Sequence, residues 1–200
     1  MTMPTKLLLA SSSSYRRSLL ERLGLEFQSQ SPDIDESPIP NESPKDLVKR
    51  LSLGKAKALA SDYPDHLIIA SDQVAQFGQK ILGKPHTVEK AIGQLSSFNG
   101  QSVTFHTGLC LLNTRTGNYQ LDTVPFTVHF RELSEQQIRF YINEERPLDC
   151  AGSFMCEGLG ITLFKKMEGD DPNSLIGLPL IRLTEMLNNE GVDPLNPYTH

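Results

Sequence analysis

The chain has 200 residues, which fits one domain or two small lobes and excludes a large multidomain assembly. Hydrophobic residues make up 38% of it and charged residues 22%, close to ordinary globular proteins, so extended disorder is excluded. The formal net charge of -5 argues against broad, nonspecific nucleic-acid binding, which needs an excess of Lys and Arg. We therefore expect any anionic ligand to bind in a local basic pocket.

Cysteine usage and the N-terminal segment indicate the compartment. Cys110, Cys150 and Cys156 form no CxxC pair, so the sequence predicts neither a disulfide framework nor a zinc site, and a reducing compartment fits best. The first apolar run, Leu7 to Ala10, is too short for a signal-peptide core or a membrane span. We therefore expect a cytoplasmic protein that binds neither membranes nor nucleic acid.

Apolar spacing, helix caps and turn residues predict an alternation of strands and helices. In chain order the pattern predicts a strand at 6–10, a helix ending at Gly24, a strand at 25–31, a helix at 43–60, strands at 67–73 and 80–82, a helix at 87–98, strands at 103–112 and 124–130, a helix from Ser134 to before Pro147, a strand at 161–164 and a helix from Pro179 to Gly191. Because a hairpin interrupts this alternation, we predict an α/β fold with a mixed, twisted β-sheet flanked by helices.

Four serines, Ser11 to Ser14, separate the first predicted strand from the first predicted helix, whose first turn carries Arg16 and Arg17. Hydroxyls, cations and the free backbone N–H groups of a helix start all favour an anion such as phosphate. The segment matches neither a Walker loop nor GxGxxG, and an ordinary serine-rich turn is an equally good interpretation.

The predicted helix at 43–60 places one lysine on its apolar side. At 100° per residue, one stripe contains Leu47, Val48, Leu51, Ala58 and Leu59. Lys55 falls inside this stripe, whereas the opposite face carries Lys49, Arg50 and Lys57. A lysine at the edge of a stripe can extend into solvent, but at its centre the ammonium needs an anionic partner. We therefore favour an inward Lys55 that meets a protein carboxylate or a ligand.

Two acidic residues and a second lysine are further candidates. Asp72 lies at the C-terminal end of an apolar strand, where α/β sheets commonly bind ligands, although a capping aspartate would look the same. With Glu36, on a proline-rich loop, it could supply the oxygen ligands that Mg²⁺ prefers. Lys84 follows a strand directly and is a candidate phosphate contact or an ordinary turn lysine.

Seven motifs follow one another along the chain: LLLASSSSYRRSLLERLG, DIDES, RLSLGKA, IIASDQV, LGKP, GSFMCEGLG and LIGLPL. In this order, from about Leu7 to Leu187, they resemble the Maf family of nucleoside triphosphate pyrophosphatases. The resemblance implies a single domain over residues 1–200 with a Maf/ITPase-like, two-lobed fold and an active cleft between the lobes. It also implies a homodimeric enzyme that uses a divalent metal cation, Mg²⁺ or Mn²⁺, to cut a nucleoside triphosphate between its α and β phosphates.

The resemblance also assigns roles by position. Asp72 matches the proton acceptor that would activate the attacking water, and Glu36 matches an acidic residue associated with metal and water. Metal binding is accordingly expected at Glu36 and Asp72. Lys55 and Lys84 match lysines that offset charge on the triphosphate. The phosphate-binding loop is matched by Ser11, Ser13 and Arg16.

Three further positions set the choice of base in this family, and here they are Tyr15, Gln73 and Glu157. The trio is similar to the YceF-type branch, which hydrolyses 7-methyl-GTP, with Tyr15 in place of that branch's usual Trp. An aromatic face attracts the cationic 7-methylguanine ring, and Glu157 adds negative charge. The implied role is to remove modified nucleotides before polymerases use them. The alternatives are a non-catalytic nucleotide-binding regulator of cell division and a pyrophosphatase for another nucleotide.

Overall fold

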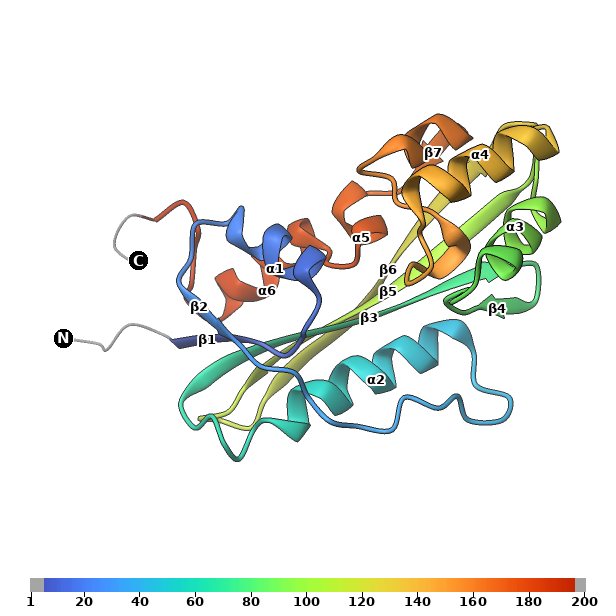
Figure 1. Ribbon diagram of the computed structural model, residues 1–200. Helices are drawn as coiled ribbons and strands as arrows, with labels where there is room; N and C mark the ends of the chain where they lie inside the picture. The colour runs from blue at the N-terminus through green and yellow to red at the C-terminus, as the bar shows by residue number, and fades with distance from the viewer. Residues whose placement is uncertain (1–5, 197–200) are drawn as a thin grey trace.

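The structure, a computed structural model, describes residues 6–196 as helices packed on a mixed β-sheet (Figure 1). Its strands are β1 (Lys6–Leu9), β2 (Phe27–Ser29), β3 (His66–Phe77), β4 (Lys80–Leu82), β5 (Ser102–Asn113), β6 (Tyr119–Phe130) and β7 (Phe164–Glu168). The sheet order is β2-β1-β3-β5-β6-β7, with β4 paired to β3. β1 runs parallel to β2 and β3, whereas the other pairs are antiparallel. The predicted mixed α/β fold is confirmed.

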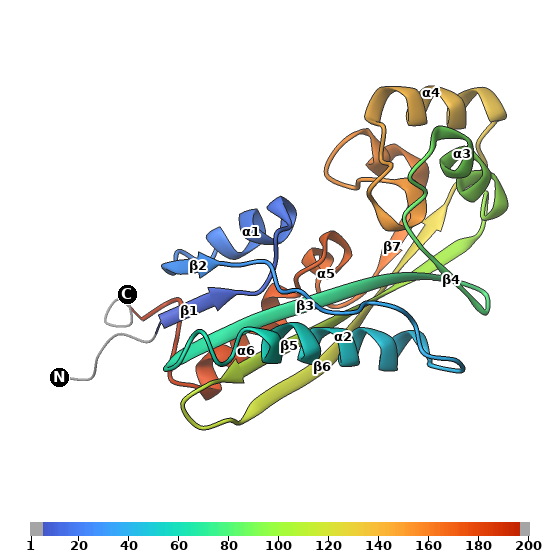
Figure 2. The same ribbon diagram turned by 60° about the horizontal axis from the view of Figure 1, so that its bottom comes forward.

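Helices cover both faces of the long strands β3, β5 and β6 (Figures 1 and 2). The α-helices are α1 (Ser14–Glu21), α2 (Pro44–Ala58), α3 (Val88–Ser97), α4 (Glu135–Glu145), α5 (Pro172–Ile176) and α6 (Leu180–Asn189). α2 packs on one face, while the other face carries α1 and α6 at one end of the strands and α3 and α4 at the other, with α5 between these groups. This arrangement produces two lobes joined by shared strands.

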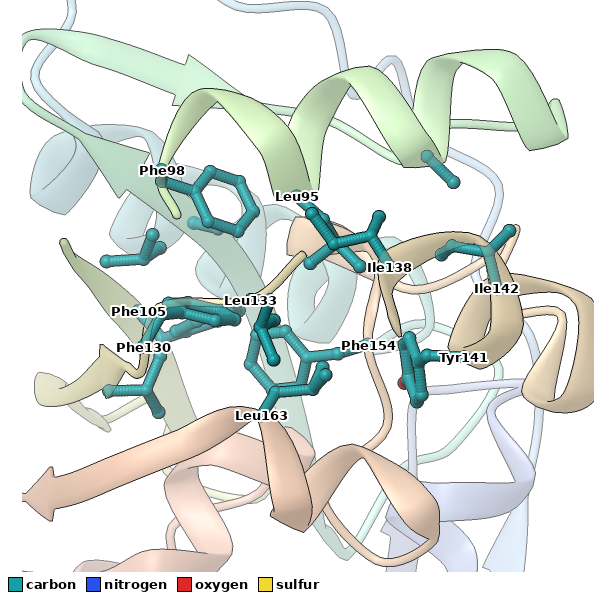
Figure 3. Packing of buried hydrophobic residues seen from close by; sticks show 14 of the residues in the cluster. Leu95, Phe98, Phe105, Phe130, Leu133, Ile138, Tyr141, Ile142, Phe154 and Leu163 are labelled. Atoms are coloured by element: carbon teal, nitrogen blue, oxygen red, sulfur yellow. The ribbon is translucent and has the colours of Figure 1, made fainter. Parts of the chain in front are cut away.

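Each lobe has its own hydrophobic core. Leucines of α1 and α6 pack on β1, β3 and β5 in one lobe. The other lobe is rich in phenylalanine, as Figure 3 shows for Phe105, Phe130 and Phe154. The Phe130 and Phe154 rings meet in a T-shaped arrangement with centroids 5.7 Å apart, a geometry that aromatic pairs prefer. A third cluster, which includes Ala56 of α2 and Ile68 of β3, lies on the face of the sheet that α2 covers.

The predicted helix starts are confirmed where caps are visible in the sequence. The Ser43 side chain accepts a hydrogen bond from the Asp46 backbone N–H, and Ser134 and Gln137 form a reciprocal capping box. The apolar stripe of α2 is buried apart from Ala58, which is exposed at the last turn. At that end of the helix, the stripe residue that is buried is Leu59, the C-cap.

The prediction of a strand at 161–164 is wrong. Residues Leu159–Leu163 form a 3-10 helix, η2, and β7 begins only at Phe164. The chain is tightly folded here, since a Cβ on Gly160 would lie 2.2 Å from the carbonyl oxygen of Met155. A second 3-10 helix, η1 (Ala151–Ser153), and the short α5 also lie in segments for which the sequence pattern predicted no helix.

One edge of β3 is interrupted in the middle of the strand. β1 pairs with His66 to Ile69 on this edge, and β4 pairs with Ala75 to Phe77, whereas β5 follows the opposite edge from Leu67 to Gln76. Within the part of the chain that the structure describes, residues 70–74 therefore have no strand neighbour on the interrupted edge. Asp72 lies at the centre of this stretch, so its backbone faces the space between the lobes. The prediction that Asp72 ends its strand is wrong, because β3 continues to Phe77 through its pairing with β4 and β5.

α2 lies unusually close to β5 because β5 has a glycine beneath it. A Cβ built on Gly108 would lie 2.3 Å from the Val48 carbonyl oxygen and 2.6 Å from Ser52 Oγ. Such distances are below any ordinary contact, so a side chain at this position would push the helix away from the sheet. Because Gly108 has no side chain, α2 can lie close to the sheet above Asp72, which pairs with Gly108.

Replacing this glycine should destabilise the fold. We expect Gly108→Ala to lower the free energy of unfolding by about 3 kcal/mol, the upper end of the usual cost of overpacking, because the clash is with backbone. For a protein of this size the melting temperature should fall by roughly 6 to 12 °C. Gly93→Ala is the matched control, because Gly93 is exposed in α3 with no atom within 4 Å of the added Cβ. Equal melting temperatures for the two variants would contradict the close approach.

Candidate active site

An ammonium group between two carboxylates forms the centre of the site. Lys55 Nζ, from α2, lies 2.6 Å from Asp72 Oδ1 on β3 and 2.8 Å from Glu36 Oε1 on the proline-rich loop. Lys55 and Asp72 are each 7% exposed, while the Glu36 side chain is 58% exposed. The predicted inward orientation of Lys55 is confirmed. Its charge is balanced by a buried acid on one side and a solvent-accessible acid on the other.

The two carboxylates suit a divalent cation that is also bound by phosphate. Mg²⁺ in phosphate sites usually takes one or two carboxylate oxygens and completes its shell with phosphate oxygens and water. Glu36 and Asp72 both line one cleft, beside the same ammonium. Within residues 6–196, no group of three or more His, Cys, Asp or Glu side chains could hold a metal ion. Two carboxylate donors match the number that Mg²⁺ commonly takes from the protein in phosphate sites.

The serine loop is held in one conformation by its own hydroxyls. Ser11, which is buried, accepts a hydrogen bond at Oγ from the Ser13 backbone N–H at 3.1 Å. Ser13 is the N-cap of α1, and its Oγ accepts from the Arg16 N–H at 3.4 Å. The helix N-terminus therefore opens onto the cleft with a fixed set of backbone donors, as an anion site requires.

Arg16 is held in the site by a residue near the other end of the chain. Its Nε donates to the Gly177 carbonyl oxygen at 2.9 Å, and Ser71 Oγ lies 2.9 Å from that same oxygen. Burial lowers the pKa of Arg16, while the nearby carboxylates of Asp72 and Glu36 oppose that shift. Sequence reasoning missed Ser71 and Gly177 as positioning residues. Their only sequence signal was membership of the IIASDQV and LIGLPL motifs.

The structure brings the predicted site residues together. A cleft of about 580 Å³ is lined by all of them except Glu157: Ser11, Ser13, Tyr15, Arg16, Glu36, Lys55, Asp72, Gln73 and Lys84. Glu157 lines an adjoining pocket of about 200 Å³, whose wall also includes Tyr15, Gln73 and Lys84. In residues 6–196, neither Arg16 nor Lys84 takes part in an ion pair with a protein carboxylate. Both cations are therefore free to meet an anionic ligand.

Gln73 presents one defined side of its amide to the smaller pocket. Side chains alternate along a strand, so Gln73 points away from Asp72 and toward α5. Its Nε2 donates to the Ser174 carbonyl oxygen at 2.7 Å and also lies 2.9 Å from Thr107 Oγ1. The donor side of the amide is thus occupied, which leaves Oε1 as the group that can accept a hydrogen bond. Thr107 and Ser174 were not predicted as part of the site.

The rest of the smaller pocket combines apolar and acidic groups. Its apolar and sulfur-containing wall is formed by Phe105, Phe154, Met155, Cys156, Leu175 and Ile176. Tyr15 donates from its hydroxyl to Met155 Sδ at 3.1 Å, which ties α1 to this wall. Burial raises the pKa of Tyr15, and the pKa is raised further by its neighbours Cys150, Glu157, Glu145 and Asp149. Asp149 and Glu157 in the lining are matched in number by Arg16 and Lys84, so the feature that favours a cationic ligand is the Tyr15 ring with Glu157 nearby.

A serine-lined, partly basic cleft that opens into a smaller aromatic pocket, on a mixed α/β sheet, is the arrangement of a nucleotide-binding α/β protein. The chain belongs to the Maf family, since the family described as Maf-like protein matches residues 6–190. None of the helices in residues 6–196 is long and apolar enough to cross a membrane.

Relatives with assigned names cover nearly the whole chain. A protein of Pseudomonas savastanoi pv. phaseolicola named 7-methyl-GTP pyrophosphatase is 62% identical over 93% of this chain and 97% of its own length. A Pseudomonas aeruginosa protein of the same name is also 62% identical, over 94% of this chain and 97% of its own. The solved structure of the Staphylococcus aureus Ham1 protein aligns with 63% of this chain and 72% of its own, at 12% identity and a TM-score of 0.45.

The buried ion pair should make Lys55 and Asp72 depend on each other. We expect Lys55→Met to lower the free energy of unfolding by about 3 kcal/mol, because it leaves a buried carboxylate without its cation. Adding Asp72→Asn to the same chain should recover part of that loss, since the charge is removed. Urea denaturation at neutral pH measures both changes. Lys57→Met, on the exposed face of α2, is the control, and strictly additive effects of the two site substitutions would contradict the pairing.

Proposed function

We propose that this protein is a nucleoside triphosphate pyrophosphatase that hydrolyses 7-methyl-GTP to 7-methyl-GMP and diphosphate. The observation that carries the proposal is the Lys55 ammonium held between Asp72 and Glu36, in a cleft that adjoins a pocket lined by Tyr15 and Glu157. Family membership and the two Pseudomonas relatives of that name support it. The triphosphate would occupy the larger cleft and the base the smaller pocket.

Asp72 is proposed as the general base. Lys55 engages Oδ1, so the second oxygen, Oδ2, is left to take a proton from the water that attacks the α-phosphorus. The P–O bond to the β-phosphate then breaks, and diphosphate leaves. Positive charge from Arg16, Lys55 and Lys84 stabilises the negative charge that develops on the phosphate oxygens. Arg16 and Lys55 are already held in place by Gly177 and by Asp72 and Glu36, so their charges need little rearrangement when the substrate binds.

Glu36 and Asp72 are also the proposed ligands of a divalent cation, Mg²⁺ or Mn²⁺. When bound, such an ion supplies further positive charge at the phosphate oxygens. The exposed position of Glu36 on its loop lets this carboxylate leave Lys55 and turn toward a cation without a buried charge being stranded. Ser11, Ser13 and the N-terminus of α1 are proposed to hold the terminal phosphates.

The choice of base is proposed to rest on charge. Methylation at N7 makes guanine cationic, and the ring of Tyr15, with Glu157 nearby, attracts a cation. Glu157 and Gln73 Oε1 are both acceptors, so they suit the N–H donors on the guanine edge. Unmethylated GTP would lack the favourable ring charge and would bind less well.

The wider role is proposed from the same reasoning. Removal of 7-methyl-GTP would keep the modified nucleotide from polymerases. The cysteines of residues 6–196 are free thiols, which suits the reducing cytoplasm proposed as its compartment. A homodimer formed by one-domain protomers is the proposed assembly.

Diphosphate release tests the function directly. The purified protein should release diphosphate from 7-methyl-GTP with a higher kcat/KM than from GTP or the other unmodified triphosphates, and a chelator should suppress release. Binding of nucleotide without any diphosphate release in a metal-supplemented assay would instead indicate a regulator. Preference for another triphosphate would correct the substrate.

Removing the proposed base should separate binding from turnover. We expect Asp72→Asn to lower kcat for 7-methyl-GTP by about 10²- to 10⁴-fold, because a positioned general base contributes this much. Calorimetry should show nucleotide affinity within a few-fold of the unchanged protein. Asp62→Asn, on the exposed loop after α2, is the control. Unchanged turnover with saturating metal would remove Asp72 from this role.

The aromatic ring of Tyr15 should matter more for the methylated base. We expect Tyr15→Ala to raise KM for 7-methyl-GTP about two- to thirtyfold more than KM for GTP, the range of a cation–π contact. Tyr15→Phe keeps the ring and loses only the hydrogen bond to Met155, so it should retain most of the preference. Steady-state kinetics on both nucleotides provides the comparison, and equal effects of Tyr15→Ala on both would rule out the charge-based preference.

A further inference from the structure

An aspartate outside the assigned site lies where the cleft and the smaller pocket meet. Asp149 lines both cavities, and its side chain is 89% exposed. The ion-pair partner that it has within residues 6–196 is His86, whose Nδ1 is 3.9 Å away, too far for a hydrogen bond. Both carboxylate oxygens are therefore available to a ligand at the junction.

The backbone around Asp149 holds it in this position. It occupies a turn after α4 in which the Cys150 N–H donates to the Pro147 carbonyl oxygen at 3.4 Å. The Leu148 carbonyl oxygen accepts from the His86 N–H at 2.9 Å, which ties the turn to the loop that carries Lys84. Both loops line the cleft, so Asp149 and Lys84 belong to neighbouring backbone segments that this hydrogen bond joins.

The position of Asp149 indicates which part of a nucleotide it meets. Any nucleotide with its base in the smaller pocket and its phosphates in the cleft places its sugar at the junction between them. The residues that line both cavities are Ser13, Tyr15, Arg16, Gln73, Lys84, Asp149 and Ala151. Among these, Asp149 is the anionic one. A carboxylate repels phosphate, but it accepts hydrogen bonds from hydroxyls, and the sugar is the part of the ligand at this point that carries them.

We propose that Asp149 binds the ribose 2′- and 3′-hydroxyls and makes this site select ribonucleotides over 2′-deoxyribonucleotides. Vicinal hydroxyls of ribose can each donate to one oxygen of a single carboxylate, whereas a 2′-deoxy sugar offers one donor fewer. The inference rests on the proposed function in that it needs a nucleotide bound across both cavities. It does not depend on which bond is hydrolysed.

A binding experiment tests the inference without turnover. In protein carrying Asp72→Asn, calorimetry should show that 7-methyl-GTP binds about tenfold or more tightly than its 2′-deoxy counterpart, as expected for a hydrogen bond to a charged group. Adding Asp149→Ala should weaken binding of the ribonucleotide about tenfold to a hundredfold and leave the two ligands nearly equal. Glu144→Ala, an exposed acid in the same helix region that lines neither cavity, is the control and should keep the preference.

Two results would overturn the inference. One is equal affinity for the ribo and 2′-deoxy ligands before Asp149 is changed. The other is an equal loss of affinity for both ligands on Asp149→Ala, which would mean that the carboxylate acts on the charge of the base. A ribose preference without diphosphate release by the unsubstituted protein would support the inference while rejecting the proposed function. Absence of nucleotide binding would reject both.

Discussion

The contact on which the site depends is the one between Lys55 and Asp72. Two buried charges are stable together only at short range, and each would be costly alone. Their meeting requires α2 to lie low over the sheet, which Gly108 allows by presenting no side chain to Val48. Glu36 then joins from a loop at the surface. Gly108 on β5 thus allows the ion pair that Asp72 on the neighbouring strand β3 makes with Lys55.

The interrupted edge of β3 explains why two cavities, rather than one, meet at this place. β1 and β4 pair with the two ends of the strand and leave residues 70–74 open between the lobes. Successive side chains of an extended strand point to opposite faces, so Asp72 turns toward α2 and Gln73 toward α5. The proposed general base, Asp72, and the residue proposed to contact the nucleobase, Gln73, are therefore one peptide unit apart and keep a fixed register because both belong to one strand.

The sequence predicted correctly those features that depend on neighbouring residues, such as helix starts and the buried side of a helix. Helical spacing alone predicted that Lys55 points inward, and the capping residues marked the start of α2 and α4. The strand predicted at 161–164 failed because close backbone packing at Gly160, not side-chain pattern, shapes that segment. Contacts between distant segments, such as Arg16 with Gly177 or Gln73 with Ser174, leave no periodic signal, since their partners lie more than a hundred residues away. Roles for Tyr15, Gln73 and Glu157 came from the family resemblance, not from spacing.

The carbonyl group of Gly177 has a consequence for how the protein is made. It accepts the Arg16 side chain from a position 161 residues later in the chain, and the residues just before it hold Gln73. Synthesis proceeds from the N-terminus, and earlier segments begin to fold first. Before α5 and Gly177 have been synthesised, the nascent polypeptide already contains Lys55, Asp72 and Glu36. It still lacks the carbonyl oxygens that bind the Arg16 guanidinium and the Gln73 amide. Any product of premature termination upstream of α5 would carry the acidic and basic side chains without a complete nucleotide site.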